Sequence, residues 1–199
     1  MLNNKKMKNI IKILICVLLN SNLWGQVLET VPLNTDDNYN NGVYFKDINN
    51  ELDSYIGTYE GVLNNKKYIF VFQKYLQVRS NNSTNSYRYF DEIKGKFKVI
   101  DLNTNTVIYN GLSATNPSDY LIYSITKANG GLFNLYFKDT DANCQNSMQF
   151  ALRSTTSPNT FKYCYFSYDD WWNDDICSYT DRMAIPVYLP KEDFILTKL

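Results

Sequence analysis

The sequence predicts an all-β protein, an antiparallel up-and-down barrel of about eight or nine strands with a short N-terminal helix. Aromatic residues make up 16% of the chain, led by 17 Tyr and 11 Phe, and they favour strands over helices. Short apolar or alternating segments follow one another, separated by turns rich in Asn, Gly and Pro. The chain has no βαβ spacing, heptad repeat or long amphipathic helix. A two-sheet β-sandwich satisfies the same pattern and is the alternative.

Residues 1–25 have the layout of a secretory signal peptide. Lysines lie near the N-terminus, an apolar run follows over 10–19, and the small residue Gly25 ends the segment. The apolar run is about half as long as a membrane span. Ile15 before Cys16 departs from the pattern of lipoprotein signals. We therefore expect cleavage after Gly25, export to the periplasm or the extracellular space, and no integral membrane segment in the mature protein.

The mature chain is predicted to have two parts. Residues 26–46 are rich in Asn and Asp with spaced apolar residues, which predicts an extended arm that is mostly loop, and residues 47–199 form a single antiparallel β domain. All 20 acidic residues but only 16 of the 20 basic residues lie beyond the leader, so the mature chain has a net charge of −4. This balance argues against nucleic acid and against an anionic membrane surface as partners.

A short helix predicted at residues 50–56 opens the β domain. Leu52 and Tyr55 share one face of this helix, and Gly57 ends it. A short helix followed by a glycine and an aromatic residue, here Gly57 and Tyr59, resembles the entry to lipocalin-type barrels. The resemblance implies that Tyr59 closes one end of the barrel, with Tyr where that family has Trp. A capped helix leading into any β-sheet is the alternative.

Strands follow in short succession, and 68–72 is a continuous apolar run that predicts burial on both faces. Residues 79–86 are predicted to form a polar loop. The last strand should pair with the first, which would place Ile195 beside Tyr59. The predicted strands are 58–63, 68–78, 93–99, 107–109, 120–127, 132–138, 147–153, 161–166 and 194–197.

Alternation predicts which side chains enter the core. Along 93–99 the apolar residues face inward, while Lys94, Lys96 and Lys98 face water. Such a row of lysines discourages edge pairing, and an anion-binding patch is the alternative. Other inward residues are Phe133, Leu135, Phe137, Met148, Phe150 and Leu152.

Three segments carry a resemblance that covers most of the mature chain. They are the arm at 30–35, the block at 44–58 and the ending at 185–198. Together they resemble a family of small secreted bacterial proteins of unknown function. This resemblance implies secretion and a single β domain, and it implies no activity.

The residue types needed for common catalytic chemistry are missing. The chain has no histidine, which removes Ser-His-Asp and Cys-His catalysis and the usual zinc ligand sets. Residues 139–143 match the opening of a calcium loop, but Cys144 stands in place of its Gly and Phe150 in place of its Glu. We predict no catalytic residue, no metal site and no cofactor, and we do not expect an enzyme.

One acidic aromatic segment is a candidate ligand site. Exposed tryptophans offer a flat face to a sugar ring or another apolar ligand, and carboxylates can bind its hydroxyl groups. In the alternative, one Trp covers the core and the acidic residues are solvated. The candidate residues are Asp169, Asp170, Trp171, Trp172, Asp174 and Asp175.

Three cysteines remain after cleavage, and an exported chain meets an oxidising compartment. If 147–153 and 160–166 form a hairpin, Cys164 lies mid-strand opposite position 149, whereas Cys144 and Cys177 reach the same rim. The sequence therefore predicts a Cys144–Cys177 disulfide with Cys164 free.

These observations predict an exported, non-catalytic β-barrel that binds a small apolar or carbohydrate ligand in its mouth or at the acidic aromatic segment. The alternative is a structural or envelope-interaction module with a filled core and no ligand. An enzyme that uses paired carboxylates ranks third, because the sequence does not show which carboxylates are close together. An open or a filled barrel interior distinguishes the first two.

Overall fold

The computed structural model describes most of the chain after Glu29. Within these residues the protein is all-β, as predicted. Helical turns are confined, in the described chain, to two 3-10 segments, η1 (Glu51–Tyr55) and η2 (Pro117–Asp119). The predicted signal peptide lies outside the described residues, which are 29–35, 41–83, 86–129, 132–138, 144, 146–170, 177–181, 186 and 188–199.

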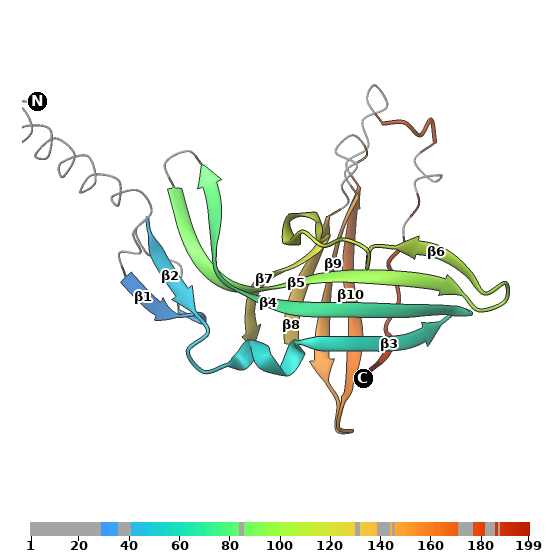
Figure 1. Cartoon of the computed structure of the whole chain (residues 1–199), viewed down its shortest axis with the longest axis horizontal. Helices are drawn as coiled ribbons and strands as arrows, with labels where there is room; N and C mark the ends of the chain where they lie inside the picture. The colour runs from blue at the N-terminus through green and yellow to red at the C-terminus, as the bar shows by residue number, and fades with distance from the viewer. Residues whose placement is uncertain are drawn as a thin grey trace, which may run out of the picture.

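Eight antiparallel strands of the described chain form a closed barrel (Figure 1). Each strand of the ring pairs with the next one along the chain, and the last pairs with the first, so this is the predicted up-and-down barrel rather than a sandwich. The ring consists of β3 (Gly57–Leu63), β4 (Lys66–Ser83), β5 (Ser86–Asp101), β7 (Ile122–Asn129), β8 (Leu132–Lys138), β9 (Asn146–Ser154), β10 (Thr160–Asp170) and β11 (Phe194–Lys198). Three further strands outside the ring are β1 (Glu29–Pro32), β2 (Val43–Lys46) and β6 (Thr106–Asn110).

The barrel closes between β11 and β3, but not in the expected register. Lys198, rather than Ile195, lies opposite Tyr59. Gly61 explains the close approach of the two strands. A Cβ atom there would lie 2.4 Å from the carbonyl oxygen of Ile195, so only a residue without a side chain allows this packing.

One edge of β5 holds three different strands in succession. It pairs with β2 at Tyr89–Phe90, with β7 at Lys94–Gly95 and with β6 at Lys98–Asp101, while β4 runs along the whole of its other edge. Between the last two pairings, β6 and β7 separate. Lys96 and Phe97 consequently face a gap in the barrel wall.

Within the polar segment predicted to be a loop at 79–86, the described residues 79–83 and 86 instead extend β4 and β5 beyond the barrel. Arg79 pairs with Tyr89, and a bulge at Gln77, where φ is +53°, bends the strand. Figure 1 shows this extension curling away from the barrel beside β1 and β2. Ser and Asn have low strand propensity, but pairing across the hairpin overrides it here.

The N-terminal arm, predicted to be mostly loop, contributes two short strands. β1 pairs in parallel with β2, and β2 pairs in parallel with β5. Val31, Val43 and Phe45 form a small buried cluster, and the Phe45 ring stacks on Phe90 at 4.8 Å. The arm is therefore held by a satellite core of its own.

The predicted helix at 50–56 is not an α-helix but the 3-10 segment η1. Asn50, before it, has a left-handed φ of +55°, and the strand begins at Gly57 with a φ of +139°. Between these two residues there is no room for an uninterrupted run of α-helical hydrogen bonds. The predicted buried face is nevertheless present, with Leu52 and Tyr55 in the core.

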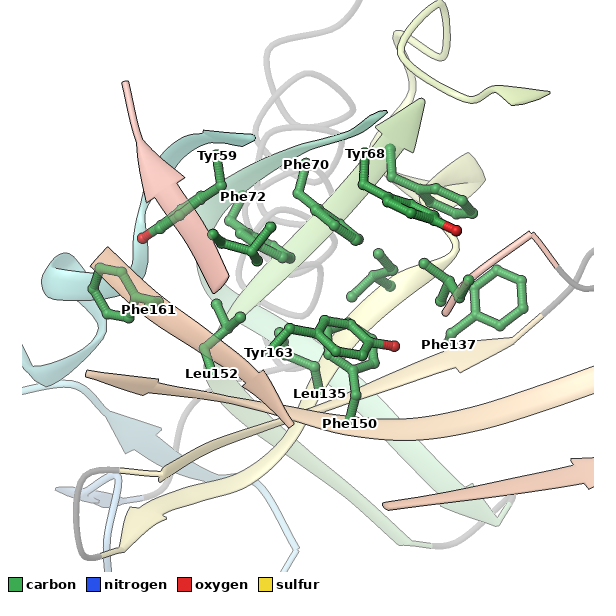
Figure 2. Close-up of a cluster of buried hydrophobic side chains, with 14 of the residues drawn as sticks. Tyr59, Tyr68, Phe70, Phe72, Leu135, Phe137, Phe150, Leu152, Phe161 and Tyr163 are labelled. Carbon is green, nitrogen blue, oxygen red and sulfur yellow. The ribbon is translucent and has the colours of Figure 1, made fainter. Parts of the chain in front are cut away.

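Aromatic side chains fill the barrel interior (Figure 2). The six inward residues predicted on β8 and β9 are all buried. On β4, however, Phe70 and Phe72 are buried while Ile69 and Val71 are half-buried, so this strand faces the core on one side only. Tyr163 of β10 stacks on Phe150 at 4.7 Å, and Figure 2 shows these rings meeting side chains from the opposite wall.

Candidate functional site

The η1 segment covers one end of the barrel. Tyr55 stacks on Phe133 of β8 at 4.5 Å, and Tyr59 packs edge-on against Phe161 of β10 at 5.3 Å. Tyr59 is completely buried, and this burial raises the pKa of its hydroxyl. The ammonium group of Lys198 lies 5.8 Å from the centre of the Tyr59 ring. This end of the barrel is packed with aromatic rings.

The segment before β11 covers the opposite end. Leu189 is 2% exposed and belongs to the main core, while Tyr188 stacks on Tyr109 at 4.7 Å. The Tyr163 hydroxyl donates a hydrogen bond to the carbonyl of Pro190 at 3.0 Å, and burial raises its pKa well above the ordinary value. Both ends of the interior are therefore occupied by side chains of the described chain.

The predicted ligand segment begins where β10 ends. The backbones of Asp169 and Asp170 pair with Ser147 and Asn146 of β9. The other four predicted residues, Trp171, Trp172, Asp174 and Asp175, lie outside the described residues.

The predicted disulfide is present. Cys144 and Cys177 are bonded, with Cα atoms 4.8 Å apart, and Cys164 is a buried free cysteine. The predicted register was wrong by two residues, because Cys164 lies opposite Ala151 rather than Gln149. Beyond the bulge between Tyr165 and Ser167 the difference is three residues, because Asp169 lies opposite Ser147, so the disulfide forms although the predicted register is wrong. The bond links Cys177, which follows the acidic aromatic segment, to Cys144, which precedes β9.

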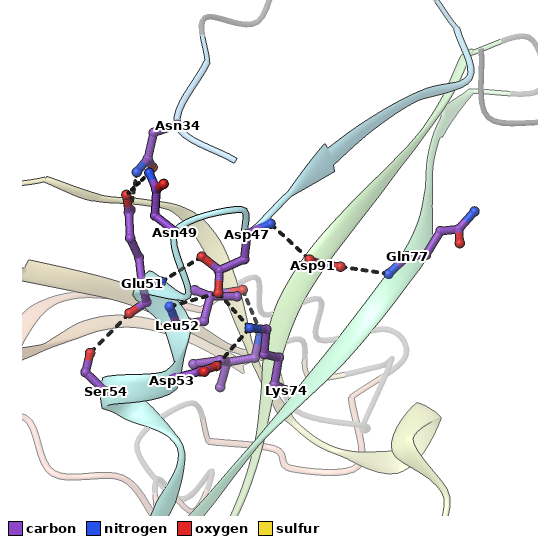
Figure 3. A network of polar contacts seen from close by, with 12 residues as sticks. Asn34, Asp47, Asn49, Glu51, Leu52, Asp53, Ser54, Lys74, Gln77 and Asp91 are labelled. Carbon is purple, nitrogen blue, oxygen red and sulfur yellow. Dashed lines mark hydrogen bonds and ion pairs between the residues drawn. The ribbon is translucent and has the colours of Figure 1, made fainter. Parts of the chain in front are cut away.

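A buried polar network joins the arm to the barrel (Figure 3). Asp91 accepts hydrogen bonds from the Tyr44 hydroxyl and from the backbone N–H groups of Asp47, at 2.9 Å, and Gln77, at 3.0 Å. It therefore holds the end of β2, the bulge of β4 and its own strand together. The members of this network are far apart in the chain, so no local sequence pattern indicates it.

Asp47 has a second role in the same network. Its carboxylate accepts the N–H groups of Glu51 and Leu52 at the start of η1, and it pairs with the Lys74 ammonium at 2.7 Å. Burial lowers the pKa of Lys74, but the hydrogen bonds to Asp47 and Asp53 outweigh this and leave it raised. The charged groups of this network pair with one another and accept hydrogen bonds from backbone N–H groups, which indicates a structural role.

Asp47 and Asp91 are the two buried carboxylates of the described chain, with exposures of 5% and 3%. A general acid or base must have an oxygen available to substrate. Each of these carboxylates instead accepts hydrogen bonds on both of its oxygens. Among the residues described, no group of three or more His, Cys, Asp or Glu side chains is arranged to hold a metal ion.

A cleft of about 260 Å³ opens in the barrel wall where β6 and β7 separate from β5. Its walls are formed by Phe97, Tyr109 and Leu121, with Lys96 and Asp119 among the polar lining residues. Alternation along 93–99 predicts Lys96 in a solvated row. The pattern of alternation gave no sign that two strands would separate beside it.

The three outward lysines of β5 have different surroundings. Lys94 pairs with Glu92 at 3.2 Å, and Lys96 donates to the carbonyl of Ala114 at 2.8 Å. Lys94, Lys96 and Lys98 are all half-buried rather than fully solvated. The interpretation as a simple solvated face is therefore wrong for Lys96, which lies in the cleft.

The described residues define a closed, internally packed β-barrel, an architecture that supports many unrelated functions. The chain belongs to DUF6705, a family of unknown function whose model matches residues 7–199. The expected membership in a family without known activity is confirmed, while bacterial origin and secretion stay predictions. No curated protein and no solved structure matches the chain.

Proposed function

We propose that the protein is an exported, non-catalytic β-barrel that acts as an interaction module through its outer surface. The observation that carries the proposal is the filled interior. Leu52 and Tyr55 close one end, Leu189 closes the other, and aromatic rings occupy the space between them. A barrel packed in this way is a rigid scaffold, and its binding surfaces lie outside it.

Export is supported by the leader and by the disulfide. Disulfides persist in oxidising compartments and are rare in the cytosol, and the chain forms one between Cys144 and Cys177. In the described chain, no helix is long and apolar enough to cross a membrane. An intact mass that corresponds to a mature chain starting at Gln26 would support export, and retention of Met1 would contradict it.

The outer surface offers apolar residues for interaction. Val62 on β3 and Ile195 on β11, the strands that meet at the closing seam, are 58% and 52% exposed. Val107 on β6 is 51% exposed. Isolated exposed apolar residues are common, but Val62 lies opposite Lys67, Lys67 opposite Ile100 and Ile100 opposite Val107, so Val62 and Val107 belong to one row across the outside of the sheet.

The test is retention on the cell envelope. Purified wild-type protein should sediment with an envelope preparation from the cells that make it, and the double variant Val62→Lys, Ile195→Lys should stay in the supernatant. Thr58→Lys with Thr197→Lys, on the same two strands, is the matched control and should behave as wild type. Equal sedimentation of all three proteins would contradict the proposal.

A second candidate function is binding of a small apolar or carbohydrate ligand by the acidic aromatic segment. It is favoured by the Cys144–Cys177 bond, which anchors that segment at the barrel rim. Of the three tryptophans, only Trp171 and Trp172 follow the leader, so Trp fluorescence reports on this segment alone. A saturable change in Trp emission on titration with soluble oligosaccharides would support this function, and an unchanged spectrum would contradict it.

A further inference from the structure

The wall cleft exists because β5 changes partners. Its pairing with β7 ends at Gly95, opposite Ile122, and its pairing with β6 begins at Lys98, opposite Asn110. Backbone hydrogen bonds hold the connection between β6 and β7 in place. The Gly111 N–H donates to the carbonyl of Phe97 at 2.9 Å, and the Ala114 N–H donates to that of Gly111 at 3.2 Å. The cleft is therefore a fixed feature of the barrel wall.

The floor and the charge of the cleft come from different residues. Phe97, Tyr109 and Leu121 provide an apolar surface, and Phe97 stacks on Tyr109 at 4.5 Å, which holds both rings in place. Lys96 supplies a half-buried ammonium group at the same cleft. Apolar walls with one positioned charge are typical of small-molecule sites.

The Lys96 ammonium is positioned but not neutralised. One of its three N–H groups donates to the carbonyl of Ala114, and the group lies 5.0 Å from the centre of the Tyr120 ring. By contrast, Lys67, Lys94 and Lys162 each pair with a carboxylate. In the part of the chain that the structure describes, Lys96 has no such partner and keeps donors for an anion.

We propose that this cleft binds a small monocarboxylate with a compact apolar body, such as an aromatic acid. The carboxylate would accept hydrogen bonds from Lys96, and the body would lie against Phe97, Tyr109 and Leu121. The volume of about 260 Å³ is below that of sites for drug-sized ligands and suits a single ring. Asp119, also at the cleft, disfavours ligands with a second negative charge.

Benzoate is the probe, and full-length mature protein labelled with ¹⁵N is titrated with it. We expect saturable amide shifts at Gly111, Ser113 and Leu121, with a dissociation constant of about 1 mM or lower. Benzamide, which has the same shape without the charge, should bind about tenfold or more weakly because it lacks the charge-assisted hydrogen bond.

Two lysine variants separate the cleft from general attraction to a basic strand. Lys96→Gln should lose about tenfold or more in benzoate affinity. Lys98→Gln, two residues along on the same face of β5 but outside the cleft, should stay within about twofold of wild type. An unchanged melting temperature for Lys96→Gln shows that the fold is intact, and Lys96→Arg, which keeps the charge, should retain part of the affinity.

Three results would overturn the proposal: no saturable shifts with benzoate, equal affinity for benzoate and benzamide, or equal loss in the Lys96 and Lys98 variants. None of these results bears on retention by the envelope, which depends on Val62 and Ile195. Failure of the cleft proposal and failure of the interaction-module proposal are thus distinguishable.

Discussion

Asp91 is the single residue on which the junction between arm and barrel depends. Its carboxylate accepts three hydrogen bonds, two from β2 and the residue that follows it and one from β4, and it is 3% exposed. Asn at this position would turn an amide N–H₂ group toward donors that need an acceptor. A buried donor that loses its partner costs free energy without compensation from water.

We therefore expect Asp91→Asn to lower the free energy of unfolding by about 2 kcal/mol. Urea titration followed by circular dichroism measures it. Glu60→Gln is the control, because Glu60 forms an exposed pair with Lys67 and such pairs contribute about 0–1 kcal/mol. Equal effects of the two substitutions would mean that the network is not what holds the junction.

The pKa of Glu92 determines the direction in which the free energy of unfolding changes with pH. Burial raises the pKa of its carboxyl above the ordinary 4.5, although Lys94 opposes the shift. A raised pKa means that the folded state binds the proton more tightly than the unfolded state does. The contribution of Glu92 to stability is therefore most favourable at low pH and declines as the pH rises from 4.5 through the folded-state pKa.

Glu92→Gln removes that titration, because its amide is neutral at every pH. The stability of wild type relative to Glu92→Gln should fall between pH 4 and pH 7, by about 1 kcal/mol or less since the group is partly solvated. Urea unfolding at the two pH values measures the difference. A relative stability that rises with pH would contradict the assigned direction of the shift.

At the scale of elements, the arm and the barrel have separate cores. Val31, Val43 and Phe45 form one cluster, and the barrel interior forms the other. The Phe45 ring contacts β5 of the barrel, where it stacks on Phe90 at 4.8 Å and lies 5.9 Å from the Arg88 guanidinium. A change in the small cluster should therefore loosen the arm and leave the barrel folded.

Phe45→Ala should increase amide hydrogen exchange at 43–46 by about tenfold or more, while the amides of β8–β10 keep their protection. Phe70→Ala, in the barrel core, is the control and should lower protection throughout by about 3–5 kcal/mol. Hydrogen exchange measured by NMR resolves the two regions. Uniform loss of protection in Phe45→Ala would show that arm and barrel unfold as one unit.

For the whole molecule, the class of fold was predictable because local sequence signals agree with it. Alternation along 93–99 and 132–138 and short Asn- and Gly-rich turns specify antiparallel hairpins in succession, which fold into a barrel or a sandwich. The disulfide was also predictable, because Cys144 and Cys177 lie outside the paired strands at the same end of the β9–β10 hairpin, whereas Cys164 lies within β10. An error of two to three residues in register did not change this.

Features that depend on contacts distant in sequence were not predictable. Strand formation at 79–83 depends on pairing partners rather than on its Ser and Asn residues, and the seam register depends on how closely Gly61 lets β11 approach. The network around Asp91 and the cleft beside Lys96 arise where separate strands meet or part. The sequence pattern of a single segment does not indicate where separate strands meet or part.

The central claim is that the barrel interior is full, and xenon tests it most directly. Xenon enters apolar cavities of roughly 150 Å³ and shifts the resonances of the methyl groups that line them. In ¹³C-methyl spectra recorded under xenon pressure, Leu135, Leu152 and Leu196 should show no saturable shift, whereas a Leu152→Ala variant, which contains a cavity, should show one at its neighbours. Saturable shifts of these methyl groups in the wild-type protein would reveal an open interior and contradict the account.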